Sequence, residues 1–247
     1  GGSVGSELAR AVAACDPDRL TLVDQSEYQL FQIERELRAR WPHLRLDPVL
    51  GDVTRPRVIR TACTAAIPDV VFHAAGYKHV TMIERDICAG ILANVLGTLS
   101  VVQAARAVGA RFVLMSSDKA VNPRSVMGTT LRFAEMVTLA QMDGAFEPVV
   151  VRFGNVFGSS GSVVELMVDC LVNQRPIPIT HPDATRYFMT VGEATTLVLR
   201  ADLLRLGGDV CWLDMGHPVR IVALVNRLLR MAKRAGMPAV PVSFIGL

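Results

Sequence analysis

The sequence has few cysteines, few lysines and little net charge, and these shortages exclude several classes of protein. Its five cysteines lie far apart, with no Cys-x-x-Cys pair, which argues against a disulfide framework or a metal site and fits a reducing compartment. The net charge of +3 arises from basic residues scattered among acids, so nucleic-acid binding is not indicated. This composition is compatible with binding of a small anionic ligand.

Long apolar runs are also missing. No stretch reaches the roughly 18 uninterrupted apolar residues of a membrane span, and no signal-peptide pattern opens the chain. Of its 247 residues, 51% are hydrophobic, which is enough to bury a sizeable core. We therefore expect a folded domain that is soluble and cytoplasmic.

From residue 20 to residue 153, apolar β-branched runs alternate with helical patterns. This alternation predicts right-handed crossovers and a parallel sheet covered on both faces, so the expected fold class is α/β, doubly wound. The predicted strands are 20–24, 44–50, 69–74, 111–116 and 148–153, and the predicted helices are 25–40, 57–66, 91–108 and 126–142. Beyond residue 155, Gly/Ser-rich and Pro-rich segments predict a smaller lobe with a helix at 191–206, a strand at 210–213 and a helix at 219–235.

One predicted strand ends in chemically reactive residues. The apolar run 112–115 is followed by Ser116, Ser117, Asp118 and Lys119 and then by an Asn-Pro turn. In an open parallel sheet, ligands bind just beyond the carboxyl ends of such strands. Lysine is scarce among the 26 basic residues, and lysine, unlike arginine, can give up its proton. The pair is therefore a candidate for proton transfer or point-charge binding; the alternative is a surface lysine beside a turn aspartate.

A glycine cluster opens the chain. Gly1–Gly5 runs into a predicted helix at Ser6, as the second half of a phosphate-binding loop does, where backbone N–H groups favour a pyrophosphate. The alternative is a flexible terminus. Asp24 ends the next strand about twenty residues later, which is the spacing of the carboxylate that binds an adenosine ribose. Because a carboxylate there repels a 2′-phosphate, we expect NAD rather than NADP.

Small and polar residues follow the next two strands. Residues 51–53, Gly-Asp-Val, either hold the adenine or form a simple turn. Residues 73–76, His-Ala-Ala-Gly, would let a cofactor lie against the backbone, and Lys78 is close enough to reach a ligand at the same edge. Asn94 lies among apolar and small residues of a predicted helix and is either a cofactor ligand or a helix-packing amide that needs a partner.

Seven segments carry a family resemblance, in order and over essentially the whole chain: residues 1–8, 24–28, 73–80, 94–98, 116–123, 152–164 and 185–190. Together they resemble the polysaccharide-biosynthesis UDP-N-acetylglucosamine 4,6-dehydratases, which are extended short-chain dehydrogenase/reductases. Proteins of this family begin one strand earlier and continue past residue 247, so the first strand is expected to precede residue 1. The resemblance implies an NAD-binding Rossmann domain at 1–154 and a mainly substrate-binding lobe at 155–247, interleaved with it.

The resemblance also implies an intramolecular redox reaction on a UDP-sugar. NAD takes a hydride from sugar C4, water is lost across C5 and C6, and the hydride returns to C6. Asp118 would protonate the leaving hydroxyl and Lys119 would take the proton from C5, with Ser117 and Met127 completing the catalytic set. We further expect a homo-oligomer and, before residue 1, a membrane-anchored region that would place the domain at the inner face of a bacterial membrane.

The remaining predicted site residues bind cofactor or substrate. For NAD they are Gly2, Ser3, Val4, Gly5, Asp24, Gly51, Asp52, Val53, Ala74, Ala75, Asn94 and Ser116. For the nucleotide sugar they are Lys78, Asn155, Ser159, Ser160, Gly161, Ser162, Val163, Val164 and Arg186, of which the arginine suits a diphosphate.

One position departs from the family pattern. The wider superfamily has Tyr-x-x-x-Lys where this chain has Met127 and Leu131. Methionine is typical of the long, membrane-anchored branch, whereas leucine is not and cannot bind the nicotinamide ribose. Three functions therefore stay open: a dehydratase, which Leu131 could impair; a non-catalytic module that binds NAD or nucleotide sugar; and a nucleotide-sugar epimerase, which the missing tyrosine disfavours.

Overall fold

The computed structural model describes residues 1–159, 161–204 and 207–246 and divides into two units. Unit 1 comprises Gly1–Phe153 and Gly192–Leu213, and unit 2 comprises Gly154–Val191 and Asp214–Leu247. The predicted substrate lobe, 155–247, included residues 192–213, which the structure assigns to unit 1. The reason is strand β10 (Val210–Trp212), which pairs in parallel with a strand of unit 1.

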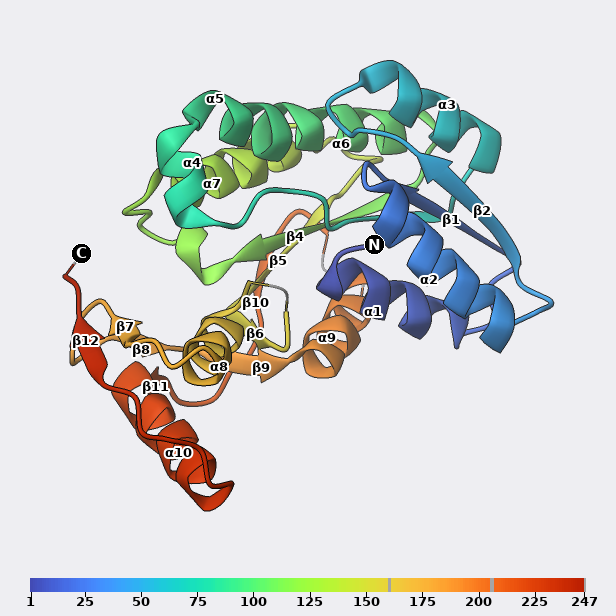
Figure 1. Ribbon diagram of the computed structural model, residues 1–247. Coiled ribbons are helices and arrows are strands. Elements are labelled where there is room, and N and C mark those ends of the chain that lie inside the picture. Colours follow the sequence, from blue (N-terminus) through green and yellow to red (C-terminus); the bar gives the residue numbers. More distant parts are fainter. Residues whose placement is uncertain (160, 205–206, 247) are drawn as a thin grey trace. The chain divides into compact units, whose positions relative to one another are not determined.

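Unit 1 is built on parallel strands (Figure 1). Four strands hydrogen-bond in the order β10-β5-β4-β3, and β1 pairs separately with β2. Within each sheet the residues that follow the strands gather at one edge, because all pairs are parallel. The bounds are β1 (Arg19–Asp24), β2 (Arg45–Leu50), β3 (Val70–His73), β4 (Arg111–Ser117) and β5 (Val149–Phe153).

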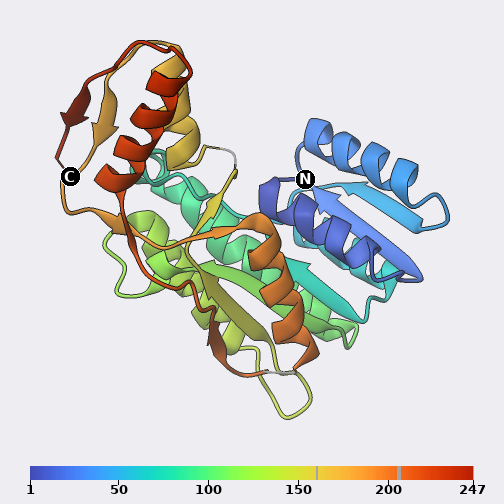
Figure 2. The same ribbon diagram turned by 90° about the horizontal axis from the view of Figure 1, so that it is seen from below.

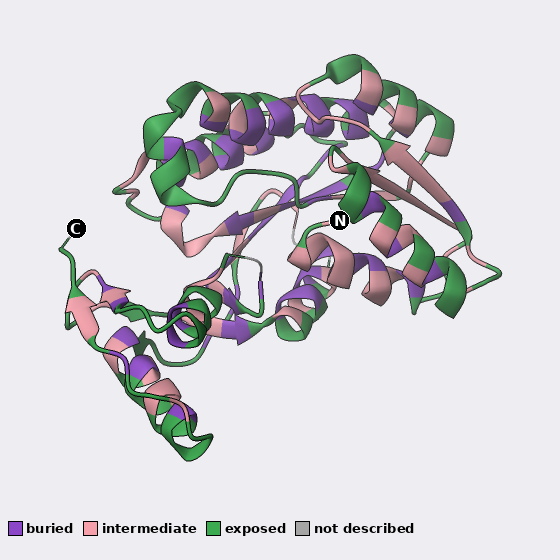
Figure 3. Ribbon diagram, in the orientation of Figure 1, coloured by how far each residue is buried: buried purple, intermediate pink, exposed green. Residues whose placement is uncertain are grey.

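Helices cover both faces of these strands (Figures 1 and 2), which confirms the predicted α/β, doubly wound class. On one face α3 (Pro56–Ala66), α6 (Gly97–Ala107) and α7 (Val126–Leu139) enclose a core that includes Phe112, Leu114 and Val150. On the other lie α1 (Ser3–Ala13), α2 (Glu27–Arg40) and α9 (Val191–Leu203). Figure 3 shows the buried residues concentrated on β4 and on the inner sides of the helices above it.

A continuous helical stretch runs from α5 (Ile87–Gly90) through the π-helical η1 (Ile91–Leu96) into α6. The sequence predicted a helix only from residue 91; it begins earlier because the Asp86 side chain accepts a hydrogen bond from the Ala89 N–H. With 21 residues and a mean hydropathy of 1.8, the stretch is long and apolar enough to span a membrane, yet half of it is buried in the protein. The core helix of a soluble protein also meets this criterion of length and hydropathy, so the stretch is weak evidence for a membrane span.

Several predicted helix boundaries moved by one to four residues, and the helix Val163–Val172 and two short helices were not predicted. The helix predicted to residue 142 ends at Leu139, and the one predicted at 191–206 ends at Leu203, with 205–206 outside the described residues. The missed α4 (Val80–Arg85) and η2 (Asp118–Ala120) are too short to show a periodic pattern.

Among its described residues, unit 2 has two helices and three pairs of very short strands; the helices can be followed in Figure 2. The helices α8 (Val163–Val172) and α10 (Ile221–Arg234) share an apolar core that includes Met167, Ile177 and Val225. The strands have two or three residues each, so no alternation marks them in the sequence. They are β6 (Asn155–Phe157) with β9 (Phe188–Thr190), β7 (Ile177–Ile179) with β12 (Val242–Phe244), and β8 (Thr185–Arg186) with β11 (Val219–Arg220).

Candidate active site

The predicted acid and base lie side by side at the carboxyl end of β4. Lys119 Nζ and Ser117 Oγ each donate to Asp118 Oδ1 over 2.9 Å. The side chains of Lys119 and Asp118 are 33% and 17% exposed, so the pair is accessible to a ligand and partly desolvated. The backbone N–H of Lys119 donates to Ser117 Oγ. Ser117 thereby caps the N-terminus of the single turn of η2. A proton can pass between an amine and a carboxylate at this distance.

The glycine cluster lies beside Asp24. The Gly1 nitrogen is 2.6 Å from Asp24 Oδ2, and the Ser26 N–H donates to Oδ1 over 2.8 Å. Helix α1 begins three residues earlier than predicted, after Gly2, and no side chain caps it. A Cβ built on Gly2 would meet nothing within 4 Å, so there is room for an anionic group beside the uncapped first turn of the helix.

The first turn of α1 also approaches the end of β3. Ser3, Val4 and Gly5 form this turn, and a Cβ built on Gly5 would lie 3.9 Å from the Cβ of Ala74. Ala74 and Ala75 are both exposed. Two segments that the sequence predicts to contact a cofactor are therefore neighbours in unit 1.

A turn follows Gly51, over residues 52–55, in which the Arg55 N–H donates to the backbone oxygen of Asp52 over 3.0 Å. The Gly51 N–H donates to the backbone oxygen of Asp24 over 2.9 Å, and Asp52 Oδ1 accepts from the Thr54 N–H over 2.8 Å. Val53 packs against the core of unit 1. The turn thus has a structural reason of its own, and contact with an adenine stays a prediction.

Asn94 is buried in η1, and its side chain is fully engaged. Its Oδ1 accepts from the Tyr77 N–H over 2.7 Å, while its Nδ2 donates to the Tyr77 oxygen over 3.0 Å and to Thr130 Oγ1 over 2.9 Å. It therefore holds the backbone next to Lys78, which is exposed, and links it to α7. A contact from Asn94 to the cofactor stays a prediction. Short π-helical segments inside α-helices are frequently found at functional sites.

His73, at the end of β3, is a buried neutral imidazole. Its Nε2 lies 3.0 Å from Thr98 Oγ1, and that hydroxyl donates over 2.6 Å to the backbone oxygen of Asn94. The hydroxyl hydrogen is thereby used, so His73 Nε2 is the donor to Thr98. Burial lowers the pKa of His73 to about 4.

We expect His73 to make the protein less stable as pH falls. An unfolded histidine has a pKa of about 6.5, so between this value and about 4 the unfolded chain binds a proton that the folded chain excludes. The free energy of unfolding should fall by about 2 kcal/mol on this account between about pH 7 and about pH 5. Urea denaturation at both pH values measures the change, and a His73→Asn variant with the same loss would contradict the assignment.

The face of α7 that carries Met127 also carries Leu131 and Glu135, at intervals of four residues. Met127 is buried, Leu131 is half-buried, and Glu135 accepts the Ser116 hydroxyl over 2.6 Å. Sequence reasoning missed Glu135; a carboxylate in an otherwise apolar stretch of helix was the available signal. Ser116 is predicted to bind the cofactor, and this stays a prediction; its hydroxyl donates to the Glu135 carboxylate.

The substrate residues predicted beyond residue 154 lie in unit 2. The Asn155 N–H donates to the Tyr187 oxygen over 2.9 Å, and the exposed Arg186 donates to the Thr185 oxygen over 2.7 Å. Ser160 lies outside the described residues. The others form the approach to α8 and its first turn: Ser159 is buried, Gly161 has a φ of 69°, Ser162 caps the helix, and Val163 and Val164 begin it.

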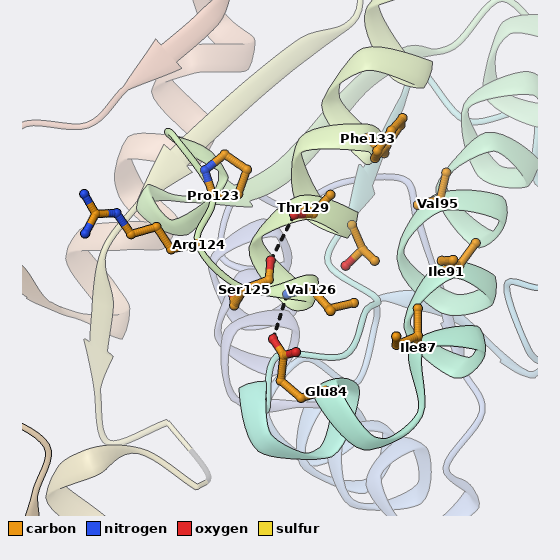
Figure 4. Close-up of a pocket in the computed structure, with 11 residues that line it drawn as sticks. Glu84, Ile87, Ile91, Val95, Pro123, Arg124, Ser125, Val126, Thr129 and Phe133 are labelled. Carbon is orange, nitrogen blue, oxygen red and sulfur yellow. Dashed lines mark hydrogen bonds between the residues drawn. The ribbon is translucent and has the colours of Figure 1, made fainter. Parts of the chain in front are cut away.

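A hollow of about 710 Å³ lies elsewhere in unit 1, between the Ile87–Val95 stretch and α7 (Figure 4). Its wall is mostly apolar, with Ile87, Ile91 and Phe133, and Glu84 accepts the Val126 N–H over 2.7 Å at its rim. None of the predicted site residues lines it.

The sequence is similar to those of known proteins. The family described as polysaccharide biosynthesis protein matches residues 1–247. The capsular polysaccharide biosynthesis protein CapD of Staphylococcus aureus is 42% identical over 236 residues, which cover 94% of this chain and 39% of CapD. The chain thus spans about two fifths of that relative's length.

Two solved structures share the fold. Pen from Bacillus thuringiensis has a TM-score of 0.91 at 28% identity, covering 100% of this chain and 76% of Pen. DesIV, a dTDP-glucose 4,6-dehydratase from Streptomyces venezuelae with NAD and TYD bound, has a TM-score of 0.82 at 19% identity, covering 99% and 82%.

The fold is that of the extended short-chain dehydrogenase/reductases, with a Rossmann-type parallel sheet. The chain belongs to the polysaccharide biosynthesis protein family.

Proposed function

We propose that the protein is an NAD-dependent nucleotide-sugar 4,6-dehydratase that acts on UDP-N-acetylglucosamine or a close analogue. The observation that carries the proposal is the Asp118–Lys119 pair, joined over 2.9 Å at the end of β4. Elimination next to a ketone needs an acid and a base on adjacent carbons, and this pair offers both. Membership in a polysaccharide biosynthesis family supports a nucleotide sugar as the substrate.

The residues around Asp24 fit NAD. The uncapped start of α1 with the open Gly2 suits a pyrophosphate, and the carboxylate beside it suits a ribose diol. NAD, when bound, would accept the hydride from sugar C4 and return it to C6. DesIV, whose structure contains NAD, shares the fold.

The acid and base are ready for elimination only when both are neutral. Moving one proton from Lys119 to Asp118 gives an amine and a carboxylic acid, and taking a proton from C5 while protonating the C6 hydroxyl restores the ion pair. Desolvation disfavours both charges, so we expect bound substrate to exclude water from the pair.

For the nucleotide sugar we propose the unit 2 residues Asn155, Ser159–Val164 and Arg186 as ligands. Lys78 of unit 1 is proposed separately, because it is exposed and follows the backbone of Tyr77, which Asn94 holds. Arg186 is exposed and its guanidinium has donors left for a diphosphate. Incubation with UDP-N-acetylglucosamine and NAD tests the function: we expect a product lighter by one water. Recovery of substrate with only C4 inverted would indicate an epimerase instead.

A second candidate, a non-catalytic module that binds NAD or nucleotide sugar, is favoured by Leu131. In this case the protein would bind UDP-N-acetylglucosamine but release no dehydrated product. Binding without turnover, measured by calorimetry and product analysis on one preparation, distinguishes this function from catalysis.

Asp24 should make the protein prefer NAD to NADP. Its carboxylate stands where a 2′-phosphate would lie, and like charges repel in a partly desolvated pocket. Titration of both cofactors checks this, and Asp24→Asn should narrow the difference. NADP binding as tight as NAD binding would show that Asp24 does not contact the ribose.

We also propose that two copies associate through the apolar face of the Ile87–Leu96 stretch and α7. Large side chains there are 42% to 51% exposed, and the helix has no charged residue from Ile87 to Ala105. Helices that bind membrane surfaces carry Lys or Arg on their polar face. Because this helix has no such residue from Ile87 to Ala105, a protein partner is favoured over a membrane surface. The exposed side chains are Ile87, Ile91, Leu92, Leu96, Phe133 and Met136.

Sedimentation tests this association. Phe133→Ser combined with Ile91→Ser should yield monomers, whereas Val172→Ser, at an equally apolar exposed position of unit 2, should not. A wild-type protein that sediments as a monomer, or binds vesicles through this face, would contradict the proposal.

The resemblance to the membrane-anchored branch supports a further proposal: the domain acts in the cytoplasm at the inner face of a bacterial membrane. Fractionation of cells that express the full-length protein tests this, since the activity should sediment with membranes.

A further inference from the structure

A fully buried carboxylate lies next to the end of β4. The Glu135 side chain is 0% exposed. Its Oε1 accepts from Ser116 Oγ over 2.6 Å and from Arg152 Nε over 2.7 Å, and its Oε2 accepts from Arg152 over 2.5 Å and from Arg132 over 2.9 Å. Burial raises the pKa of Glu135, but the hydrogen bonds, that of Arg152 foremost, outweigh it and hold the pKa below its usual range. The carboxylate is therefore charged and saturated with donors.

The donors come from three elements that meet where β4 ends. Ser116 and Arg152 are opposite one another in the β4–β5 pairing, and Arg132 lies one turn before Glu135 on α7. A buried charge tolerates little displacement of its partners, because each lost hydrogen bond leaves it uncompensated. These hydrogen bonds fix the distances between β4, β5 and α7 at Ser116. The next residue, Ser117, donates a hydrogen bond to the Asp118 carboxylate.

We propose that Glu135 is a positioning residue: through Ser116 it fixes the end of β4 and so holds Asp118 and Lys119 in place for the substrate. The kinetic consequence rests on the proposed dehydratase function. The structural consequence, order in residues 116–121, does not.

The other end of β4 provides a matched control. Asp202, on α9, is 7% exposed and accepts two hydrogen bonds, over 2.9 and 3.0 Å, from Arg111, the first residue of β4. Glu135→Gln and Asp202→Asn each remove the charge of a buried carboxylate that is paired with an arginine and hydrogen-bonded to a residue of β4. Only Glu135→Gln does so at the end that carries the acid and the base.

Two measurements on the full chain test the proposal. In hydrogen exchange, residues 116–121 should exchange about tenfold faster in Glu135→Gln than in the wild type, and should be unchanged in Asp202→Asn. In steady-state kinetics, Glu135→Gln should lower kcat about tenfold or more with KM within about threefold, since small misplacements of reacting groups are costly. Asp202→Asn should lower the melting temperature alone.

Ser116→Ala keeps the test decisive should Glu135→Gln fail to fold, because it removes only the link to β4 and leaves the Arg152 pair intact. It should reproduce the faster exchange. Equal exchange over 116–121 in all variants would overturn the proposal. A wild-type protein without turnover, combined with the expected exchange pattern, would refute the dehydratase function and leave the positioning role standing.

Discussion

Replacing Asp118 by Asn is expected to lower dehydratase turnover at least about a hundredfold, because general acid–base groups contribute factors of about a hundred to ten thousand. Lys119→Ala should do the same by removing the base. Neither change should weaken nucleotide-sugar binding by more than a few-fold, since both groups are assigned to the reacting carbons. Turnover and calorimetric affinity, measured on the same preparations, check this.

Arg186→Ala provides the opposite pattern and serves as the control. A lost charge-assisted hydrogen bond costs about 1.5–3 kcal/mol, so affinity for UDP-N-acetylglucosamine should fall about tenfold to a hundredfold, with kcat changed less. If Asp118→Asn weakened UDP binding more than it slowed turnover, Asp118 would be a binding residue and not the acid.

Leu131→Lys is expected to tighten NAD binding about tenfold, which corresponds to about 1.4 kcal/mol of binding free energy. It should also raise any dehydratase activity. Leu131 lies one helical turn after Met127. We propose, from the family resemblance, that this face of α7 looks onto the nicotinamide ribose, where Leu131 would leave the ribose hydroxyls without a charged partner. Because Leu131 is half-buried, a lysine can extend toward solvent, and the cost of an unpaired buried charge should be small.

Leu131→Met separates charge from shape, since it keeps the apolar volume without an amine. It should leave NAD affinity unchanged. A Leu131→Lys protein with a lower melting temperature and no gain in affinity would show that position 131 does not face the cofactor.

The parts of the fold that the sequence predicted are those with local causes. The buried run of β4 and the polar residues that follow it can be recognised without knowing the neighbours, because parallel strands place ligands at their carboxyl ends. The same holds for Asp24, the last residue of β1.

The parts that the sequence did not predict depend on contacts between distant residues. Glu135 receives a hydrogen bond from a serine 19 positions away and two from an arginine 17 positions away, and Asn94 is satisfied by Tyr77 and Thr130. The hydrophobic periodicity of a sequence does not indicate which distant residues become hydrogen-bond partners. The strands of unit 2 were missed because two or three residues cannot display an alternation.

In the proposed reaction, one active site removes a hydride from C4 and returns it to C6 of the same sugar. The most direct test supplies UDP-N-acetylglucosamine that carries deuterium at C4, with unlabelled NAD and the wild-type protein. We predict a 4-keto-6-deoxy product that has lost one water and carries the deuterium at C6. Deuterium that stays at C4 of an inverted sugar, or a substrate recovered unchanged under conditions where it binds, would contradict the account.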